Sequence, residues 1–325
     1  MYATAVPESY SRAKFSKSMN AKPGLTVFLL LCLSAAGVLP IAAYYQQPQT
    51  TFKTEVALVN VIFSAVDKKG NAIIGLKADD FEVLEDKRVQ KIEYFSELNE
   101  KSEVPLTVAL LIDTSGSVKS KLTYEQETAA EFFRQIIRQN KDLALVMQFD
   151  SDVNLVQDFT DDQNRLLNAL DSLKAGNSTS LYDAIYLAAE EKLEGEVGRK
   201  VIVIITDGED TSSKVRKEQA IEAAQKADVT IYGIGVASEY GVDFGVLKKF
   251  AQDTGGEFFS PRARFSDVQA AFQAIGQDLK NRYSLAYTSD YKKKDGSFHS
   301  INIRCKVSGV RVRFRKGYYS PREGD

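Results

Sequence analysis

The stretch VALLIDTSGSV, from Val108 to Val118, decides how this sequence is interpreted. Its first half is a continuous apolar run of the kind that forms a buried strand, and the run ends at Asp113. Ser115 and Ser117 follow at steps of two, so one carboxylate and two hydroxyls lie on a loop at the carboxyl end of the strand. Because ligands bind at that edge of open α/β sheets, the motif predicts a polar site there.

A second apolar run ends in the same way. VIVIIT, from Val201 to Thr206, is followed by Asp207 and Gly208. If both runs are parallel strands of one sheet, two carboxylates and two hydroxyls face one crevice.

The chain between residues 105 and 281 alternates short apolar runs with amphipathic segments, which predicts a doubly wound, mostly parallel α/β sheet. One helix is indicated by Ala129, Phe132, Phe133, Ile136 and Ile137, which recur at helical spacing and are interpreted as core. The predicted strands are Leu106 to Ile112, Leu143 to Phe149, Val153 to Phe159, Val201 to Thr206, Thr230 to Val236, and Glu257 to Ser260.

Two β-rich segments, 53–104 and 282–325, flank this region. Each is short for an independently stable sheet, so we expect them to pair into one β-sandwich with the α/β domain inserted between them. Residues 81–86 and 89–95 are expected to form a hairpin. The other predicted strands are Val56 to Val66, Tyr283 to Thr288, Ser300 to Val307, and Val310 to Tyr319.

A row of basic residues alternates with apolar ones near the C-terminus, which predicts strands with one wet and one buried face. We favour this interpretation over a membrane or nucleic-acid patch. The basic residues are Arg304, Lys306, Arg311, Arg313 and Arg315, and the apolar ones are Ile303, Cys305, Val307, Val312 and Phe314.

Residues 105–281 resemble a von Willebrand factor type A (VWFA) domain, and the flanks resemble those of an exported bacterial subfamily of such domains. The resemblance implies the sheet order 3-2-1-4-5-6 and a metal-ion-dependent adhesion site (MIDAS). Ser178 and Ser180 adjoin the threonine of this site and are alternatives to it. The implied metal ligands are Asp113, Ser115, Ser117, Thr179 and Asp207.

The resemblance also implies the chemistry of the site. Mg²⁺ takes six oxygen ligands at ~2.0 to 2.1 Å, and these hydroxyls and carboxylates supply oxygens only. Mn²⁺ and Ca²⁺ are alternatives. Two carboxylates balance the ion, so an open position would engage a Glu or Asp of a partner protein. We therefore expect a protein-binding (adhesion or assembly) module, with neither a catalytic residue nor an organic cofactor.

The N-terminal residues 1–43 have the features of an export signal. Lys14, Lys17 and Lys22 precede the apolar run Leu25 to Leu39, and small residues follow it, as in a secretory signal peptide. The alternative is an uncleaved membrane anchor over residues 25–45. Residues 44–52 are interpreted as a linker. We expect an extracytoplasmic protein that is periplasmic, secreted or at the cell surface.

Composition excludes several classes of protein. The formal net charge of −2 gives no global attraction for nucleic acid. Two cysteines, Cys32 and Cys305, exclude a disulfide framework. The single histidine, His299, excludes a multi-histidine metal site, and any Ser-His-Asp triad would have to use it, although no serine motif adjoins it.

Two other functions remain as alternatives. One is a metal-dependent hydrolase with Asp113 as nucleophile, although Ser115 stands where the second acid of an Asp-x-Asp phosphatase motif would be. The other is a structural envelope protein in which the metal only stabilises the fold. Glu209 and Asp210 are interpreted as a solvated or capping acidic loop rather than a second cation site, and residues 211–213 as the cap of the helix that follows.

Overall fold

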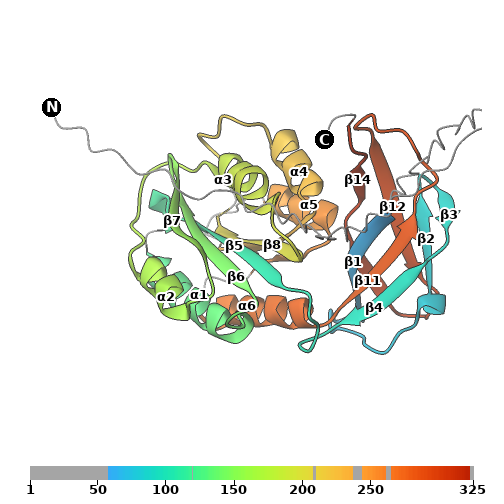
Figure 1. Cartoon of the computed structure of the whole chain (residues 1–325). Helices are drawn as coiled ribbons and strands as arrows, with labels where there is room; N and C mark the ends of the chain where they lie inside the picture. Colours follow the sequence, from blue (N-terminus) through green and yellow to red (C-terminus); the bar gives the residue numbers. More distant parts are fainter. Residues whose placement is uncertain (1–57, 119, 208–209, 237–243, 261–264, 323–325) are drawn as a thin grey trace, which may run out of the picture. The chain divides into compact units, whose positions relative to one another are not determined.

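The computed structural model describes residues 58–118, 120–207, 210–236, 244–260 and 265–322 (Figure 1). The expected leader and linker lie outside the described residues. By its internal contacts the chain divides into Met1–Lys53 and Thr54–Asp325, and the described residues all belong to the second unit. Within them, no helix is long and apolar enough to cross a membrane.

A six-stranded sheet forms the α/β part, and its strand order is β7-β6-β5-β8-β9-β10. All neighbours are parallel except β6 and β7, which are antiparallel. In chain order this arrangement is 3-2-1-4-5-6, so the fold class predicted from the sequence is confirmed. The strands are β5 (Leu106–Asp113), β6 (Leu143–Phe149), β7 (Val153–Thr160), β8 (Arg199–Thr206), β9 (Val229–Gly235) and β10 (Phe258–Phe259).

Helices cover both faces of this sheet (Figure 1). Alternate residues of β5 pack in opposite directions: Leu110 contributes to the core beneath α1, α2 and α6, and Leu111 to the core beneath α3, α4 and α5. This two-sided burial explains why the strand is apolar throughout. The helices are α1 (Leu122–Ile136), α2 (Gln163–Asp171), α3 (Leu181–Leu187), the π-helical continuation η3 (Ala188–Leu193), α4 (Lys217–Lys226), α5 (Gly245–Thr254) and α6 (Phe265–Lys280).

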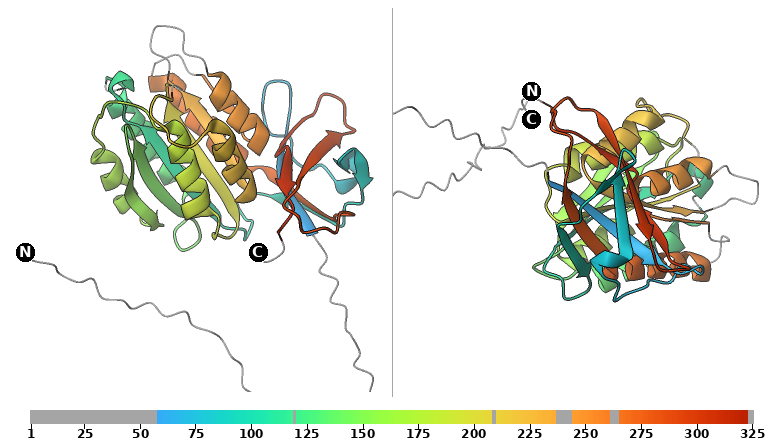
Figure 2. Two further views of the ribbon diagram at one scale, coloured as in Figure 1. Left: turned by 90° about the horizontal axis from the view of Figure 1, so that it is seen from above. Right: turned by 90° about the vertical axis from the view of Figure 1, so that its right-hand side faces the viewer.

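The flanking segments build two further four-stranded sheets, ordered β13-β1-β11-β4 and β14-β12-β2-β3. Each sheet combines both flanks, because β1 pairs with β11 and β2 pairs with β12 (Figure 2, right). Phe63, Phe81 and Tyr283 meet in their shared core. The strands are β1 (Leu58–Val66), β2 (Phe81–Glu85), β3 (Arg88–Gln90), β4 (Tyr94–Leu98), β11 (Arg282–Thr288), β12 (Phe298–Cys305), β13 (Arg311–Phe314) and β14 (Gly317–Tyr319).

Two strands predicted as continuous are each divided between the two sheets. The segment expected over 89–95 separates into β3, which pairs with β2, and β4, which pairs with β11. The segment over 310–319 separates into β13 and β14. At the second break the chain contacts the α/β domain, where the Lys316 amide donates to the Asp253 carbonyl at 2.9 Å. The alternation of apolar residues along the sequence does not show where a strand leaves one sheet and joins the other.

The prediction of a fully wet basic face is wrong for two arginines. The side chain of Arg313 is 16% exposed and that of Arg315 is 13% exposed. Arg313 Nη2 lies 2.7 Å from Asp278 Oδ1 of α6, and its Nη1 pairs with Glu257. Arg315 Nη1 lies 2.6 Å from Asp228 Oδ1. Both cations therefore join the β-sheets to the α/β domain instead of facing solvent.

Candidate metal centre

The ends of β5 and β8 bring the two predicted aspartates to one place. These strands are parallel neighbours, with Ile112 beside Ile205, so Asp113 and Thr206 adjoin. Thr206 Oγ1 donates to Asp113 Oδ2 at 2.6 Å, and Asp207 follows directly. The order reverses here, because β6 continues the sheet on the other side of β5. The two carboxylates expected at one edge of the sheet therefore lie at adjacent strand ends.

The Asp113 carboxylate is fully buried and held on both oxygens. Its Oδ1 accepts the Ser115 amide at 2.8 Å, and its Oδ2 accepts Thr206. Burial raises the pKa of Asp113 to about 6; hydrogen bonds from Thr206 and Ser115 oppose the rise, and the negative charge of Asp207 adds to it. The site is thus a low-dielectric position with an excess of negative charge, which favours a cation.

Backbone hydrogen bonds join the loop after Asp113 to the loop that carries the predicted threonine. The Gly176 amide donates to the Thr114 carbonyl at 2.6 Å, and the Gly116 amide donates to the Asn177 carbonyl at 3.1 Å. A Cβ added at Gly176 would lie 1.8 Å from Asp150 Oδ2, so this close approach needs glycine.

Thr179 is held by the third loop. Its amide donates to Thr211 Oγ1 at 2.9 Å, and the Thr211 amide donates back to the Thr179 carbonyl at 2.9 Å. Thr179 is 4% exposed, and its hydroxyl makes no hydrogen bond within the described part of the chain. Ser180 Oγ instead donates to the Ser151 carbonyl, and Ser178 is only partly buried. Among the hydroxyls of Ser178, Thr179 and Ser180, that of Thr179 is therefore the one that belongs to a buried residue and is still available as a ligand.

The predicted set is described in four of its five members: Asp113, Ser115, Thr179 and Asp207 are all buried. Ser117 lies in the 3-10 helix η2 (Gly116–Val118), and its side chain falls outside the described residues. The donors are hydroxyl and carboxylate oxygens, which suit a hard divalent cation, and the available Thr179 hydroxyl fits such an ion.

Sequence reasoning missed one carboxylate near this centre. Glu125 in the first turn of α1 is fully buried, and neither of its oxygens has a hydrogen-bond partner among the described residues. Burial raises its pKa to about 8; the charges of Asp113 and Asp207 add to this, and Lys121 opposes it. A signal was present, because Glu125 lies four residues before Ala129 and so continues the apolar stripe of the helix.

Asp210, the described acidic residue of the loop after Asp207, caps a helix, as the sequence predicts. Asp210 Oδ1 accepts Ser213 Oγ at 2.5 Å and the Tyr182 amide at 3.3 Å. The capped helix is α3, however, and not the following helix α4 as predicted. The amide of Arg216 at the start of α4 donates instead to Gln219 Oε1. Glu209 lies outside the described residues.

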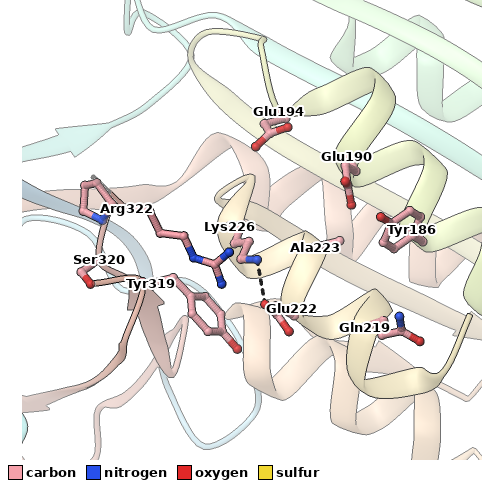
Figure 3. A pocket seen from close by; sticks show the side chains of 12 residues that line it. Tyr186, Glu190, Glu194, Gln219, Glu222, Ala223, Lys226, Tyr319, Ser320 and Arg322 are labelled. Carbon is pink, nitrogen blue, oxygen red and sulfur yellow. Dashed lines mark ion pairs between the residues drawn. The ribbon is translucent and has the colours of Figure 1, made fainter. Parts of the chain in front are cut away.

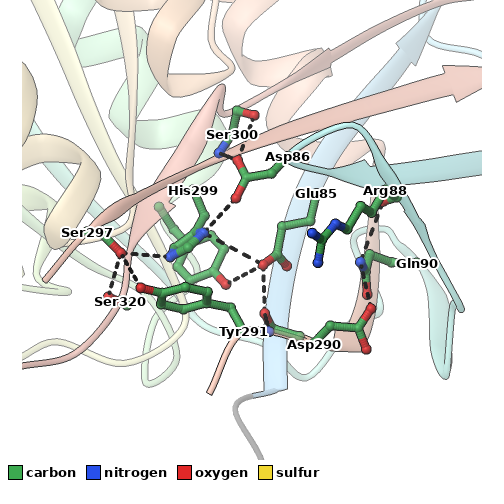
Figure 4. Close-up of polar contacts among 12 residues, drawn as sticks. Glu85, Asp86, Arg88, Gln90, Asp290, Tyr291, Ser297, His299, Ser300 and Ser320 are labelled. Atoms are coloured by element: carbon green, nitrogen blue, oxygen red, sulfur yellow. Dashed lines mark hydrogen bonds and ion pairs between the residues drawn. The ribbon is translucent and has the colours of Figure 1, made fainter. Parts of the chain in front are cut away.

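A second cluster of titratable groups lies in the β-sheets (Figure 4). Glu85, Asp86 and His299 each offer one possible ligand atom, and these three atoms lie within 4.8 Å of one another. His299 Nδ1 is 2.7 Å from Asp86 Oδ2, and His299 Nε2 is 3.0 Å from Ser297 Oγ. No serine motif adjoins His299 in the sequence, yet the connectivity is that of a Ser-His-Asp triad.

Three of the four acidic oxygens of this His299 cluster are nevertheless bonded within the protein, and the exception is the buried Glu85 Oε2, which has no hydrogen-bond partner among the described residues. Asp86 Oδ1 accepts the Ser300 amide and hydroxyl at 2.8 and 3.0 Å, and Glu85 Oε1 accepts Ser289 Oγ at 2.6 Å. Burial acts to raise the pKa of Asp86, but hydrogen bonds from His299 and Ser300 outweigh it and lower the pKa. These bonds identify a network that joins the β2–β3 hairpin to β12.

Among the described residues, the amides of Ser297 and of Gly296 before it are not free for acyl transfer. The Ser297 amide donates to Asp295 Oδ1 at 3.0 Å, and the Gly296 amide donates to the Pro321 carbonyl at 3.2 Å. An oxyanion hole needs such donors to be aimed at a substrate. We therefore assign the cluster a structural role.

A cleft of about 500 Å³ lies between α3, η3, α4 and the end of β14 (Figure 3). Its charged lining is mixed, with Glu222 paired to Lys226 at 2.7 Å and with Glu190, Glu194 and Arg322 nearby. None of the predicted metal ligands lines it. Its size alone therefore does not identify it as the functional site.

A family model described as the von Willebrand factor type A domain matches residues 107–274, which is more than half of the chain. The chain belongs to the VWFA domain family. The matched region begins in β5 and ends in α6, so it contains the metal-site loops described above. The family expected from the Asp-x-Ser-x-Ser motif is confirmed.

The chain is also similar to one curated relative and to several solved structures. An uncharacterized protein of Borreliella burgdorferi is 27% identical over 212 residues, or 60% of this chain and 60% of that protein. Proximal thread matrix protein 1 from the mussel byssus, solved with a zinc-occupied MIDAS motif, aligns with a TM-score of 0.50 and 16% identity over 61% of this chain and 50% of that one. An aerotolerance-related membrane protein from Bacteroides fragilis gives a TM-score of 0.44 and 18% identity, covering 54% and 98%.

Proposed function

We propose that this protein is an exported binding module that holds a divalent cation at its MIDAS-type site and uses it to engage an acidic residue of a partner protein. The observation that carries the proposal is the meeting of two buried carboxylates, Asp113 and Asp207, at adjacent strand ends. The available Thr179 hydroxyl adds to it.

A cation is the natural counter-charge for this arrangement. Burying carboxylates without compensation is costly, and the raised pKa of Asp113 expresses that cost. The zinc-occupied MIDAS motif of the byssus protein supports the idea that this fold holds a metal at these loops. For this chain we propose Mg²⁺ as the resident ion, with Mn²⁺ and Ca²⁺ as alternatives.

The charge of the proposed ligands indicates which kind of partner side chain the cation would bind. Asp113 and Asp207 neutralise a divalent cation, so the remaining coordination position is attractive to a Glu or Asp side chain. The leader-like residues 1–43, or an anchor over residues 25–45, would place this encounter outside the cytoplasm. The partner is thus an extracytoplasmic protein.

The hydrolase alternative is disfavoured by the residue at position 115. Ser115 stands where an Asp-x-Asp phosphatase motif would have its second acid. Phosphatase turnover that is abolished by Asp113→Asn would reverse this preference.

The decisive experiment combines cation binding with partner capture. The full-length chain should bind Mg²⁺ or Mn²⁺ in calorimetry and should retain an envelope protein in a pull-down with Mg²⁺ but not with EDTA. Asp113→Ala should lose both properties, and the exposed Asp171→Ala should keep both. Partner capture that survives EDTA and Asp113→Ala would contradict the proposal. A chelator that lowers the melting temperature without affecting capture would support the purely structural role of the metal.

A further inference from the structure

Glu125 is a buried charged group that the five-residue motif does not explain. It lies in the first turn of α1, twelve residues beyond Asp113 and directly after the metal-site loop. The side chain is fully buried, and both carboxylate oxygens lack a hydrogen-bond partner among the described residues.

Neither protonation state of Glu125 is satisfied by the surrounding protein. An ionised carboxylate would be buried without a bonded cation, and a protonated one would carry an O–H with no acceptor. Buried polar groups in folded proteins are almost always paired, so an orphan of this kind indicates a missing ion or water.

The place of Glu125 indicates which ion is missing. Asp113 and Asp207 both act on its charge, so the three carboxylates lie within electrostatic reach of one another. Lys121 offsets only part of this negative charge, and its Nζ donates to the Val236 carbonyl at 3.3 Å. The shared counter-charge is then the cation of the MIDAS-type site.

We propose that Glu125 is a third carboxylate of the metal centre and binds the cation directly or through one water. This inference rests on the proposed function, because it assumes that a cation occupies the site. It adds a consequence: three carboxylates exceed the charge of a divalent ion, so the site holds its metal more tightly and attracts acidic partner groups less strongly than Asp113 and Asp207 alone would.

The test is the Mn²⁺ affinity of the full-length chain with Glu125→Gln, which keeps the shape and removes the charge. We expect the dissociation constant measured by calorimetry to rise about 10- to 100-fold, the usual effect of removing an outer-shell partner of a metal. The matched control is Glu127→Gln, an exposed residue of the same helix, which should bind Mn²⁺ like the wild type.

A second readout separates metal binding from simple packing. If Glu125 serves the metal, Mn²⁺ should raise the melting temperature of Glu125→Gln less than that of the wild type. A purely structural Glu125 would change the melting temperature equally with and without Mn²⁺, and that outcome would overturn the inference.

Failure of the inference can be told from failure of the proposed function. Wild-type Mn²⁺ affinity in Glu125→Gln, with binding lost in Asp113→Ala, would reject only the role of Glu125. A wild type that binds no Mn²⁺ would reject both. If Glu125→Gln does not fold, Glu125→Asp decides: weaker Mn²⁺ binding supports the inference, and wild-type affinity overturns it.

Discussion

The metal-site loops of the α/β domain and the His299 cluster of the β-sheets both gather titratable side chains from distant parts of the chain. They differ in what their polar atoms bond. In the His299 cluster, serines supply partners to Asp86, and Ser289 supplies one to Glu85. In the metal site, the Thr179 hydroxyl and both oxygens of Glu125 find none among the described residues.

This difference is the reason why we assign the His299 cluster a structural role and propose the other region as the binding site. Proximity of acids and a histidine is insufficient, since three of the four acidic oxygens of the cluster are already bonded within the protein and only Glu85 Oε2 is left to offer a ligand. Polar groups that stay buried and unpaired lower the stability of the empty protein, and they persist where a ligand completes them. We expect the two regions to respond differently when one of them is changed at a time.

The largest effect is expected for Asp113→Ala. Removing this carboxylate takes away a proposed ligand and the bonds to Thr206 and Ser115, so Mn²⁺ binding in calorimetry should fall below detection. The His299 cluster should be unaffected, because it shares no bond with Asp113. If Asp113→Ala binds Mn²⁺ with wild-type affinity, Asp113 is not part of a metal site and the proposed site is wrong.

The pH dependence of cation binding should be the next largest effect. The pKa of Asp113 is raised to about 6, so below that pH the folded protein carries a proton that the cation must displace. Asp113 alone should make the Mn²⁺ affinity fall about tenfold for each unit of pH below about 6. If Glu125 also serves the metal, its pKa of about 8 should make the affinity begin to fall already below about pH 8. In chelator the sign for stability is opposite: the folded state binds the proton more tightly than the unfolded state does, so this group's contribution falls as the pH rises from about 4 through about 6.

These two curves are measured by calorimetry and by thermal unfolding between pH 4 and 8. Asp113→Asn provides the control, because it removes the titrating group while keeping its size. A cation affinity of the wild type that stays constant across this range would contradict the burial argument for Asp113.

Gly176→Ala should perturb the metal site by an intermediate amount. The new Cβ would overlap the Asp150 side chain, with its nearest approach 1.8 Å from Oδ2, and would push apart the loops that place Thr179. We expect a loss of about 1–3 kcal/mol in the free energy of unfolding, together with weaker Mn²⁺ binding. Gly195→Ala is the control, because nothing lies within 4 Å of its added Cβ. Equal effects of both substitutions would reject the close-approach explanation.

Ser297→Ala should give the smallest effect. It removes the hydrogen bond between Ser297 Oγ and His299 Nε2, which is worth about 0.5–1.5 kcal/mol in the free energy of unfolding. Mn²⁺ affinity should not change. A hydrolytic activity that is lost in this variant would show that the cluster is an active site rather than a structural network.

The two regions also differ in how far the sequence predicts them. The apolar runs that lead to Asp113 and Asp207 predict that these two aspartates lie close together, because parallel strands bring their carboxyl ends to one sheet edge. The His299 cluster has no such rule: Asp86 and His299 are far apart in sequence and meet only because β2 pairs with β12. The breaks that separate β3 from β4 and β13 from β14 were missed for the same reason, since periodicity does not report which sheet a strand joins.

By itself the sequence determined the α/β class of the central domain and, through its resemblance to the VWFA family, predicted the order of the central sheet and the candidate metal ligands. The strands and helices follow from short-range pattern, that is, from apolar runs, helical stripes and polar residues directly after strands, whereas the sheet order and the choice of Thr179 follow from the resemblance. Only the tertiary structure decided that the Thr179 hydroxyl is available while that of Ser180 is bonded, that Arg313 and Arg315 join the two parts, and that Glu125 is buried beside the site. Each of these depends on which distant groups compete for the same hydrogen bond or charge, and that competition exists only once the chain has folded.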